Sequence, residues 1–156
     1  MRMLLAVVVI AGVIFYFFTH MNNQKAAKEN IAKGKEFLAQ NVQREEVFET
    51  LSGLQYEVLV KGDNTEHPKA TDSVTVHYHG TLIDGTVFDS SVDRGQTIDF
   101  PLNRVIKGWT EGVQLMSVGD KFRFYIPSQL AYGNRATGKI EGGSVLIFDV
   151  ELFAIN

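Results

Sequence analysis

Few residues in this chain have side chains that could perform covalent chemistry. None of its 156 residues is a cysteine, so thiolate nucleophiles, disulfides and Cys-ligated metals are excluded. Ser90 and Ser91 do not lie in the strand–turn–helix context of a nucleophile elbow. No Gly-Lys-Ser/Thr sequence opens a helix, as a phosphate-binding loop requires. Nucleophilic catalysis and phosphoryl transfer are therefore poorly supported.

Two histidines are spaced so that they could share a ligand. His77 and His79 are two residues apart on an expected strand, so their side chains lie on one face. No third ligand is spaced to complete the roughly three or four that zinc sites need. We therefore interpret them as exposed strand histidines opposite Val76 and Tyr78, and expect no metal and no cofactor. A metal-dependent enzyme remains an alternative.

Aromatic residues are the remaining candidates, spread over four expected strands, one helix and one long loop. They are Tyr78, Phe88, Phe100, Trp109, Tyr132 and Phe148. Any one of them alone is more simply a core residue. Asp89 directly follows Phe88, and an inward carboxylate needs partners, for which Arg94 and the Tyr78 hydroxyl are candidates. An apolar cup with one anchored polar cluster is typical of a small-ligand site.

One helix must position the tryptophan. The stretch from Arg104 to Met116 carries apolar residues at i, i+3 and i+7, namely Ile106, Trp109 and Val113. Gly108 and Gly112 each lower its helix propensity by roughly 1 kcal/mol relative to Ala. A helix this short is not stable alone, so we expect strands to surround it.

The rest of the C-terminal part has strand patterns. The expected strands are 55–60, 74–82, 86–89, 97–100, 121–126 and 144–153, with a hairpin turn at Asp84-Gly85. Ser128 to Gly143 is a long irregular segment, and loops of this length are usually functional. Hairpins without βαβ alternation predict an α+β domain in which an antiparallel sheet packs on one helix.

The N-terminal part is different in composition. Met3 to Phe18 is an uncharged apolar run, just short of the roughly twenty residues that span a bilayer. We expect residues 1–21 to be a membrane anchor, with a cleaved signal peptide as the alternative. Residues 22–50 are expected to form a helical linker, interrupted by Gly34 and mainly solvated, or else a pairing surface between two chains. Residues 51–156 would be the folded domain.

Charge limits the partners. The formal net charge of −3 implies no basic face for nucleic acid. Lysines after the apolar run would place the domain in the cytoplasm by a literal positive-inside count. That rule is a tendency, and long domains translocate largely regardless of charge.

Several stretches together resemble one family. They are Val76 to Ser91 (VHYHGTLIDGTVFDSS), Val105 to Val113, Ala131-Tyr132-Gly133 and Phe148 to Leu152. In this order they closely resemble the FKBP family of peptidyl-prolyl cis-trans isomerases over essentially all of residues 51–156. Gly34 to Leu38 and Ser52 to Tyr56 are similar to its bacterial macrophage-infectivity-potentiator-like branch, with a shortened N-terminal region.

The resemblance implies a curved antiparallel sheet wrapped around the short helix, with a proline pocket between them. Trp109 would be the pocket floor, and the walls would be Tyr78, Phe88, Phe100 and Phe148. The rim would be Val105, Ile106 and Ile140. Asp89 would be held by Tyr78 and Arg94, while the Tyr132 hydroxyl and the Ile106 amide would donate hydrogen bonds to a substrate carbonyl.

Two departures from the family pattern stand out. Ile98 occupies a pocket position where an aromatic residue is common, which should change the shape of one wall. Glu141-Gly142 replaces a usual Pro-Pro or Pro-Gly pair, which bears on the rigidity of the loop.

The implied activity is isomerisation of X-Pro bonds in folding proteins, inhibited by macrolides. A non-catalytic chaperone or proline-binding adaptor is the alternative. The family branch favours an inner-membrane protein whose domain faces the periplasm; a secreted periplasmic form after cleavage and a cytoplasm-facing domain are the other possibilities.

Overall fold

The computed structural model describes residues 2–156, with side-chain exposure from residue 7 onward, so Met1 of the expected anchor lies outside the described residues. The helices are α1 (Arg2–Asn41), α2 (Ser91–Arg94) and α3 (Lys107–Val113), and the 3-10 turns are η1 (Leu102–Arg104) and η2 (Ser128–Leu130). The strands are β1 (Phe48–Glu49), β2 (Gln55–Val60), β3 (Ser73–Leu82), β4 (Val87–Ser90), β5 (Ile98–Pro101), β6 (Lys121–Ile126) and β7 (Leu146–Ile155).

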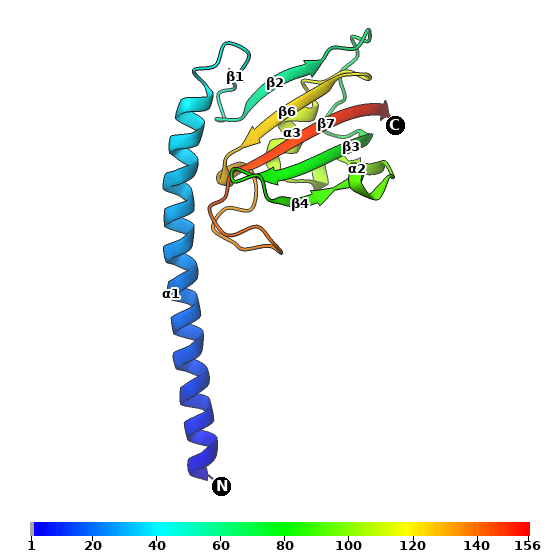
Figure 1. Cartoon of the computed structure of the whole chain (residues 1–156). Helices are drawn as coiled ribbons and strands as arrows, with labels where there is room; N and C mark the ends of the chain where they lie inside the picture. The colour runs from blue at the N-terminus through cyan, green and yellow to red at the C-terminus, as the bar shows by residue number, and fades with distance from the viewer. Residues whose placement is uncertain (1) are drawn as a thin grey trace.

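The strands form one antiparallel sheet of seven in the order β1-β2-β6-β7-β3-β4, with β5 paired to β3. Figure 1 shows the curved sheet with α3 behind it and α1 extending far beyond it as one rod. The predicted α+β class with an antiparallel sheet around one short helix is therefore confirmed. The bounds of β2 and β6 are those predicted from the sequence.

The α3 helix is shorter than predicted. It runs from Lys107 to Val113, because Val105 and Ile106 before it have extended backbone angles. Its glycines allow the sheet to approach closely. A Cβ atom at Gly108 would lie 2.5 Å from the Ile126 side chain, and one at Gly112 would lie 2.7 Å from Phe124. Close packing against the sheet therefore requires glycine at these two positions, and these glycines give the segment its low helix propensity.

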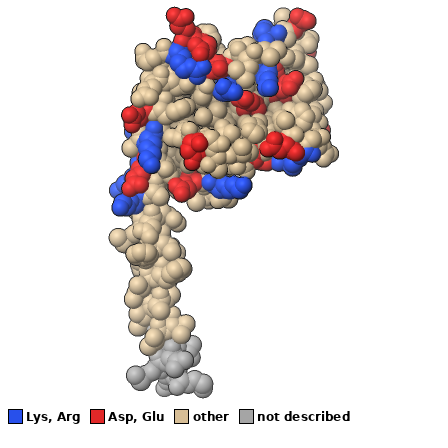
Figure 2. Space-filling view, viewed as in Figure 1, with Lys and Arg blue, Asp and Glu red and all other residues tan. Residues whose placement is uncertain are grey.

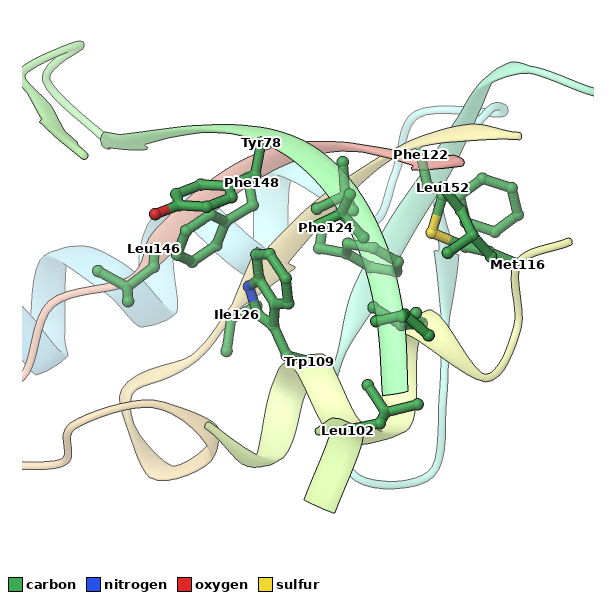
Figure 3. Packing of buried hydrophobic residues seen from close by; sticks show 14 of the residues in the cluster. Tyr78, Leu102, Trp109, Met116, Phe122, Phe124, Ile126, Leu146, Phe148 and Leu152 are labelled. Atoms are coloured by element: carbon green, nitrogen blue, oxygen red, sulfur yellow. The ribbon is translucent and has the colours of Figure 1, made fainter. Parts of the chain in front are cut away.

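The core lies between α3 and the sheet. Alternate residues of β3, β6 and β7 point into it, including the fully buried Val76, Phe124 and Leu146. Figure 3 shows Trp109 rising from α3 toward the sheet near Tyr78, Phe148 and Ile126, with Phe122, Met116 and Leu152 at the other end of the cluster. Burial of these side chains stabilises the short helix that could not stand alone.

Helix α1 is continuous, which corrects the expectation of a linker helix interrupted at Gly34. Its C-terminal half is mainly exposed, as expected of a solvated linker, but one face is buried at Ala27, Gly34 and Asn41. A Cβ atom at Gly34 would lie 2.7 Å from the Val145 side chain, so this glycine permits contact with the start of β7. Small and polar residues make much of this contact, and Phe37 adds a ring contact with Tyr125, with centroids 5.9 Å apart.

The N-terminal half of α1 is exposed and apolar. Large apolar side chains are exposed from Val7 to Phe18, and in Figure 2 this part of the rod carries no charged side chain on the visible face. By length and composition, the described part of the helix is sufficient to cross a membrane.

Candidate functional site

A pocket of about 720 Å³ lies between α3, the sheet and the long loop after η2. Ten of the predicted site residues line it: Tyr78, Phe88, Asp89, Phe100, Val105, Ile106, Trp109, Tyr132, Ile140 and Phe148. Arg94 and Ile98 do not line it. Four lining residues were not predicted, namely Arg104, Thr137, Gly138 and Lys139.

The apolar part of the pocket is built from rings that meet edge to face. The Trp109 ring is T-shaped to Tyr78, Phe100 and Phe148, with centroids 5.3, 5.5 and 5.3 Å apart. Phe88 meets Phe148 in the same way at 5.3 Å. Such contacts favour fixed ring orientations beyond simple burial of area. Because Trp109 is only 4% exposed, it belongs to the core and to the pocket at the same time.

One polar cluster lies at the edge of these rings. The Tyr78 hydroxyl donates a hydrogen bond to Asp89 Oδ2, and Arg94 forms an ion pair with Asp89 Oδ1. Arg94 Nη2 also donates to the Tyr78 oxygen at 3.1 Å. The predicted contacts of Asp89 are therefore present. The carboxylate is less inward than expected, because the Asp89 side chain is 43% exposed.

Helix α2 brings Arg94 to this cluster. Ser90 is its N-cap and accepts a hydrogen bond from Asp93 N, and Gly95 ends it with a left-handed φ of 70°. Desolvation opposes ionisation of Asp89, but the Tyr78 hydrogen bond and the Arg94 charge outweigh it and lower its pKa. Burial first, and then the hydrogen bond to Asp89, raises the pKa of Tyr78. Asp89 is thus an anion and Tyr78 a neutral donor near neutral pH.

Two hydrogen-bond donors border the pocket. The Tyr132 side chain is 40% exposed on the loop after η2, with no hydrogen bond from its hydroxyl to any described residue. The Ile106 N–H precedes α3 and has no acceptor within residues 2–156. Donors directed at an apolar cup suit a carbonyl-bearing ligand.

Family models match most of the chain. Residues 64–153 match the FKBP-type peptidyl-prolyl cis-trans isomerase model, and residues 10–58 match the domain amino terminal to that isomerase. The chain belongs to the FKBP-type peptidyl-prolyl cis-trans isomerase family. The predicted resemblance is confirmed.

Curated relatives and solved structures agree with this assignment. The FKBP-type isomerase FkpA of Aeromonas hydrophila is 59% identical over 138 residues, which are 88% of this chain and 51% of the relative. The outer membrane protein MIP of Legionella longbeachae is 43% identical over 133 residues, 85% of this chain and 57% of the relative. The chain therefore spans about half the length of these relatives.

The crystal structure of FkpA from Escherichia coli superposes with a TM-score of 0.84 at 39% identity, covering 94% of this chain and 71% of that one. An isomerase structure from Pseudomonas syringae gives 0.77 at 34% identity, covering 83% and 96%. Both likenesses support the fold assignment directly.

The residues that sequence reasoning missed lie mainly on the loop of the FKBP-type pocket. Thr137 and Ile140 exchange backbone hydrogen bonds of 2.8 and 2.9 Å, which present Gly138 and Lys139 at the pocket. The length and glycine content of this loop were the available signal. Ile98 instead pairs with Val76 across β3 and β5 and packs against the core.

The two histidines face the same side of β3, as expected, but they are half-buried instead of exposed. His77 Nδ1 bonds Ser91 Oγ at 2.9 Å, and His79 Nδ1 bonds Ser90 Oγ at 2.8 Å. These contacts tie β3 to the start of α2. Within the described residues, no group of three or more His, Cys, Asp or Glu side chains could hold a metal.

Proposed function

We propose that this chain is a peptidyl-prolyl cis-trans isomerase that accelerates rotation of X-Pro bonds in folding proteins. One observation supports the proposal above all: the aromatic pocket around Trp109, with the Asp89 cluster at its edge, lies in a chain of the FKBP-type family. Proline-containing polypeptides are the proposed substrates, and macrolides are expected inhibitors.

The proposed chemistry is non-covalent. Partial double-bond character gives the X-Pro amide a rotation barrier of roughly 18–20 kcal/mol. Twisting the bond localises the nitrogen lone pair and removes this resonance. A dry pocket that fits the twisted amide better than either planar form lowers the barrier by differential binding.

Each pocket residue has a proposed role. Trp109 is the floor for the proline ring, and the walls are Tyr78, Phe88, Phe100 and Phe148. Val105, Ile106 and Ile140 form the rim, and Ile98 supports the pocket indirectly through the core on which it packs. The Tyr132 hydroxyl and the Ile106 N–H donate to the substrate carbonyl. Asp89 provides a fixed negative charge beside the rotating amide, held in place by Tyr78 and Arg94.

A proline-peptide isomerisation assay on the full chain tests the activity. We expect catalysis that a macrolide ligand blocks, and a folded but inert protein would contradict it. A second candidate, a non-catalytic chaperone or adaptor, is favoured by the unusual Glu141-Gly142 in the loop beside the pocket. Asp89→Val combined with Tyr132→Phe separates the two. Loss of isomerisation with unchanged client refolding would favour the adaptor.

We further propose that α1 anchors the protein in the bacterial inner membrane as a single span, with the domain in the periplasm. The exposed apolar side chains from Val7 to Phe18 support an anchor, and one relative is named an outer membrane protein. A cleaved periplasmic form and a cytoplasm-facing domain are the alternatives. A reporter fused after Asn156, active on one side only, distinguishes the orientations; the mass of the mature N-terminus distinguishes cleavage.

A further inference from the structure

The loop from Gly133 to Gly143 contacts two parts of the molecule, the aromatic pocket and helix α1. On one side, residues Thr137 to Ile140 line the pocket. On the other side, the loop forms a groove with α1 that includes Ala27 and Ile31 of the helix and Asn134 and Gly142 of the loop. The helix thus contacts the segment that borders the proposed proline site, although α1 itself contributes no residue to the lining of that site.

Asn30 makes the polar contacts across this boundary. Its Nδ2 atom donates to the carbonyl oxygen of Gly142 at 3.0 Å and to Glu141 Oε2 at 3.0 Å. The first of these bonds is partly buried, and bonds that are shielded from water are lost at greater cost. One amide on the helix therefore fixes both a backbone and a side-chain atom of the loop.

Close packing supports the same contact. Gly143 has a φ of +78°, and a Cβ atom there would lie 2.3 Å from the Ala27 carbonyl oxygen. Ala27 is itself buried. Glycine at this position lets the loop backbone lie directly on the helix backbone, with no side chain between them.

The contact between α1 and the loop is linked to the pocket by a hydrogen bond between the two ends of the loop. Gly143 N donates to the Gly133 carbonyl oxygen at 2.7 Å, and Gly133 follows Tyr132 in the chain. Ile140, which lines the pocket, directly precedes the Glu141-Gly142 pair held by Asn30. A shift of this pair would therefore move pocket-lining residues at both ends of the loop.

We infer that Asn30 is a positioning residue for the isomerase pocket, through which α1 holds the loop in its substrate-binding conformation. This chain has Glu141-Gly142 where a proline pair is usual, and the helix supplies the rigidity that prolines would otherwise give. The inference rests on the proposed function. It makes the helix, and not only the domain, part of the structure that determines substrate affinity.

Asn30→Asp is the sharpest test, because it keeps the shape of the side chain but replaces the donor with a carboxylate facing Glu141. In full-length protein in detergent, we expect kcat/KM for a proline peptide to fall about fivefold to tenfold, mainly through KM. Amide exchange of residues 133–143 should become faster, while the thermal midpoint stays within about 2 °C of wild type. Adding Glu141→Gln to this variant should restore part of the activity, since the Gln amide can donate to the new carboxylate.

Asn22→Asp is the matched control, since it makes the same change on an exposed turn of the same helix. This control should leave both KM for the proline peptide and amide exchange of residues 133–143 unchanged. The inference is overturned if Asn30→Asp keeps wild-type KM and wild-type loop exchange, or if Asn22→Asp alters them equally. An inactive wild-type protein would contradict the proposed function instead, and loop exchange alone would then decide the role of Asn30.

Discussion

Two clusters, each of a tyrosine, a carboxylate and an arginine, lie in different parts of this molecule. Beside the pocket, Tyr78 bonds Asp89 and Arg94. Beneath the end of α1, Tyr125 donates to Glu57 Oε2 at 2.8 Å and accepts from Arg44 Nη1 at 3.0 Å. Both tyrosines are almost completely buried. The chemistry is shared, but the surroundings are not.

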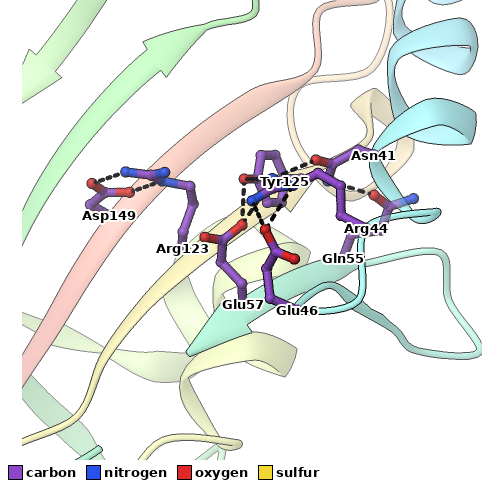
Figure 4. A network of polar contacts seen from close by, with 8 residues as sticks. All are labelled: Asn41, Arg44, Glu46, Gln55, Glu57, Arg123, Tyr125 and Asp149. Carbon is purple, nitrogen blue, oxygen red and sulfur yellow. Dashed lines mark hydrogen bonds and ion pairs between the residues drawn. The ribbon is translucent and has the colours of Figure 1, made fainter. Parts of the chain in front are cut away.

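The carboxylates differ most. The Asp89 side chain is 43% exposed, whereas that of Glu57 is 8% exposed. Figure 4 shows Glu57 enclosed by Tyr125 and Arg44, with Asn41 and Gln55 beside them and the Arg123–Asp149 pair on the neighbouring strands. The cluster under α1 is part of the contact between the helix and the sheet, while the Asp89 cluster faces an accessible pocket. The solvent exposure of the carboxylate therefore indicates whether an ion pair is available to a ligand.

A groove of about 580 Å³ also lies beside the α1 cluster. Its charged lining residues already have partners: Arg123 pairs with Asp149 across the lining at 2.6 Å, and Arg44 pairs with Glu57 and Glu46 outside it. The pocket around Trp109 instead presents the Ile106 N–H and the Tyr132 hydroxyl without acceptors among the described residues. The aromatic lining together with these two donors, more than volume, distinguishes the candidate site.

The largest effect on stability is expected at Glu57. Glu57→Ala leaves the buried Tyr125 hydroxyl and one contact of Arg44 without their acceptor, and should lower the free energy of unfolding by about 2–3 kcal/mol. The isomerisation rate of the folded protein should not change. Chemical denaturation with Glu46→Ala as control tests this, because Glu46 pairs with the same arginine at the surface and should contribute less than about 0.5 kcal/mol. Equal losses for both variants would contradict the difference between the clusters.

The corresponding change at the pocket should affect rate more than stability. Asp89→Asn keeps the size of the side chain but removes its charge, and kcat/KM should fall about tenfold, equivalent to about 1.4 kcal/mol. Because Asp89 is half-exposed, the free energy of unfolding should change by less than about 1 kcal/mol. Parallel rate and denaturation measurements on one preparation check both. A large stability loss with an unchanged rate would assign Asp89 a structural role only.

Removing one hydroxyl from each cluster gives a smaller, paired test. Tyr125→Phe should lower the free energy of unfolding by about 1–2 kcal/mol and leave the rate unchanged. Tyr78→Phe should cost a similar amount of stability and also reduce kcat/KM about threefold, since Asp89 loses one of its two partners. If both variants reduced the rate equally, the distinction between the two clusters would fail.

The smallest effect is expected from pH. Because the folded-state pKa of Asp89 is lowered, the contribution of its ionised form is complete above about pH 4 and is lost as the pH falls through the folded pKa. The pKa of Tyr78 is raised, so its protonated form persists at least to about pH 10 and is lost as the pH rises through the folded value. We expect kcat/KM to be flat from about pH 5 to 8. A bell-shaped profile centred near neutrality would indicate a titrating catalytic group elsewhere.

The sequence predicted the residues of the pocket better than the bounds of α3, the helix that carries Trp109. Alternation defined β6 correctly, because the inward Phe122, Phe124 and Ile126 reflect which face is buried. The bounds of β2 were also correct, although its buried residues are the polar Gln55 and Glu57. The aromatic set and the pairing of Asp89 with Tyr78 and Arg94 were predicted, since they lie within one hairpin and its neighbours or belong to a recognisable family pattern. The bounds of α3 were not, because Val105 and Ile106 continue an apolar pattern that also suits an extended segment.

Patterning along the chain therefore predicted the fold class and the apolar rod of α1, and the family resemblance supplied most of the residues that line the pocket. Only the tertiary structure decided what the second half of α1 does. Contacts of this half and of the turn just after it join residues far apart in sequence: Asn30 with Gly142, 112 positions away, and Arg44 with Tyr125, 81 positions away. The buried positions Ala27, Gly34 and Asn41 recur every seven residues, but small and polar residues occupy them, so hydrophobicity along the chain did not mark this face. Whether an asparagine on a helix faces water or holds a loop depends on which surface packs against it.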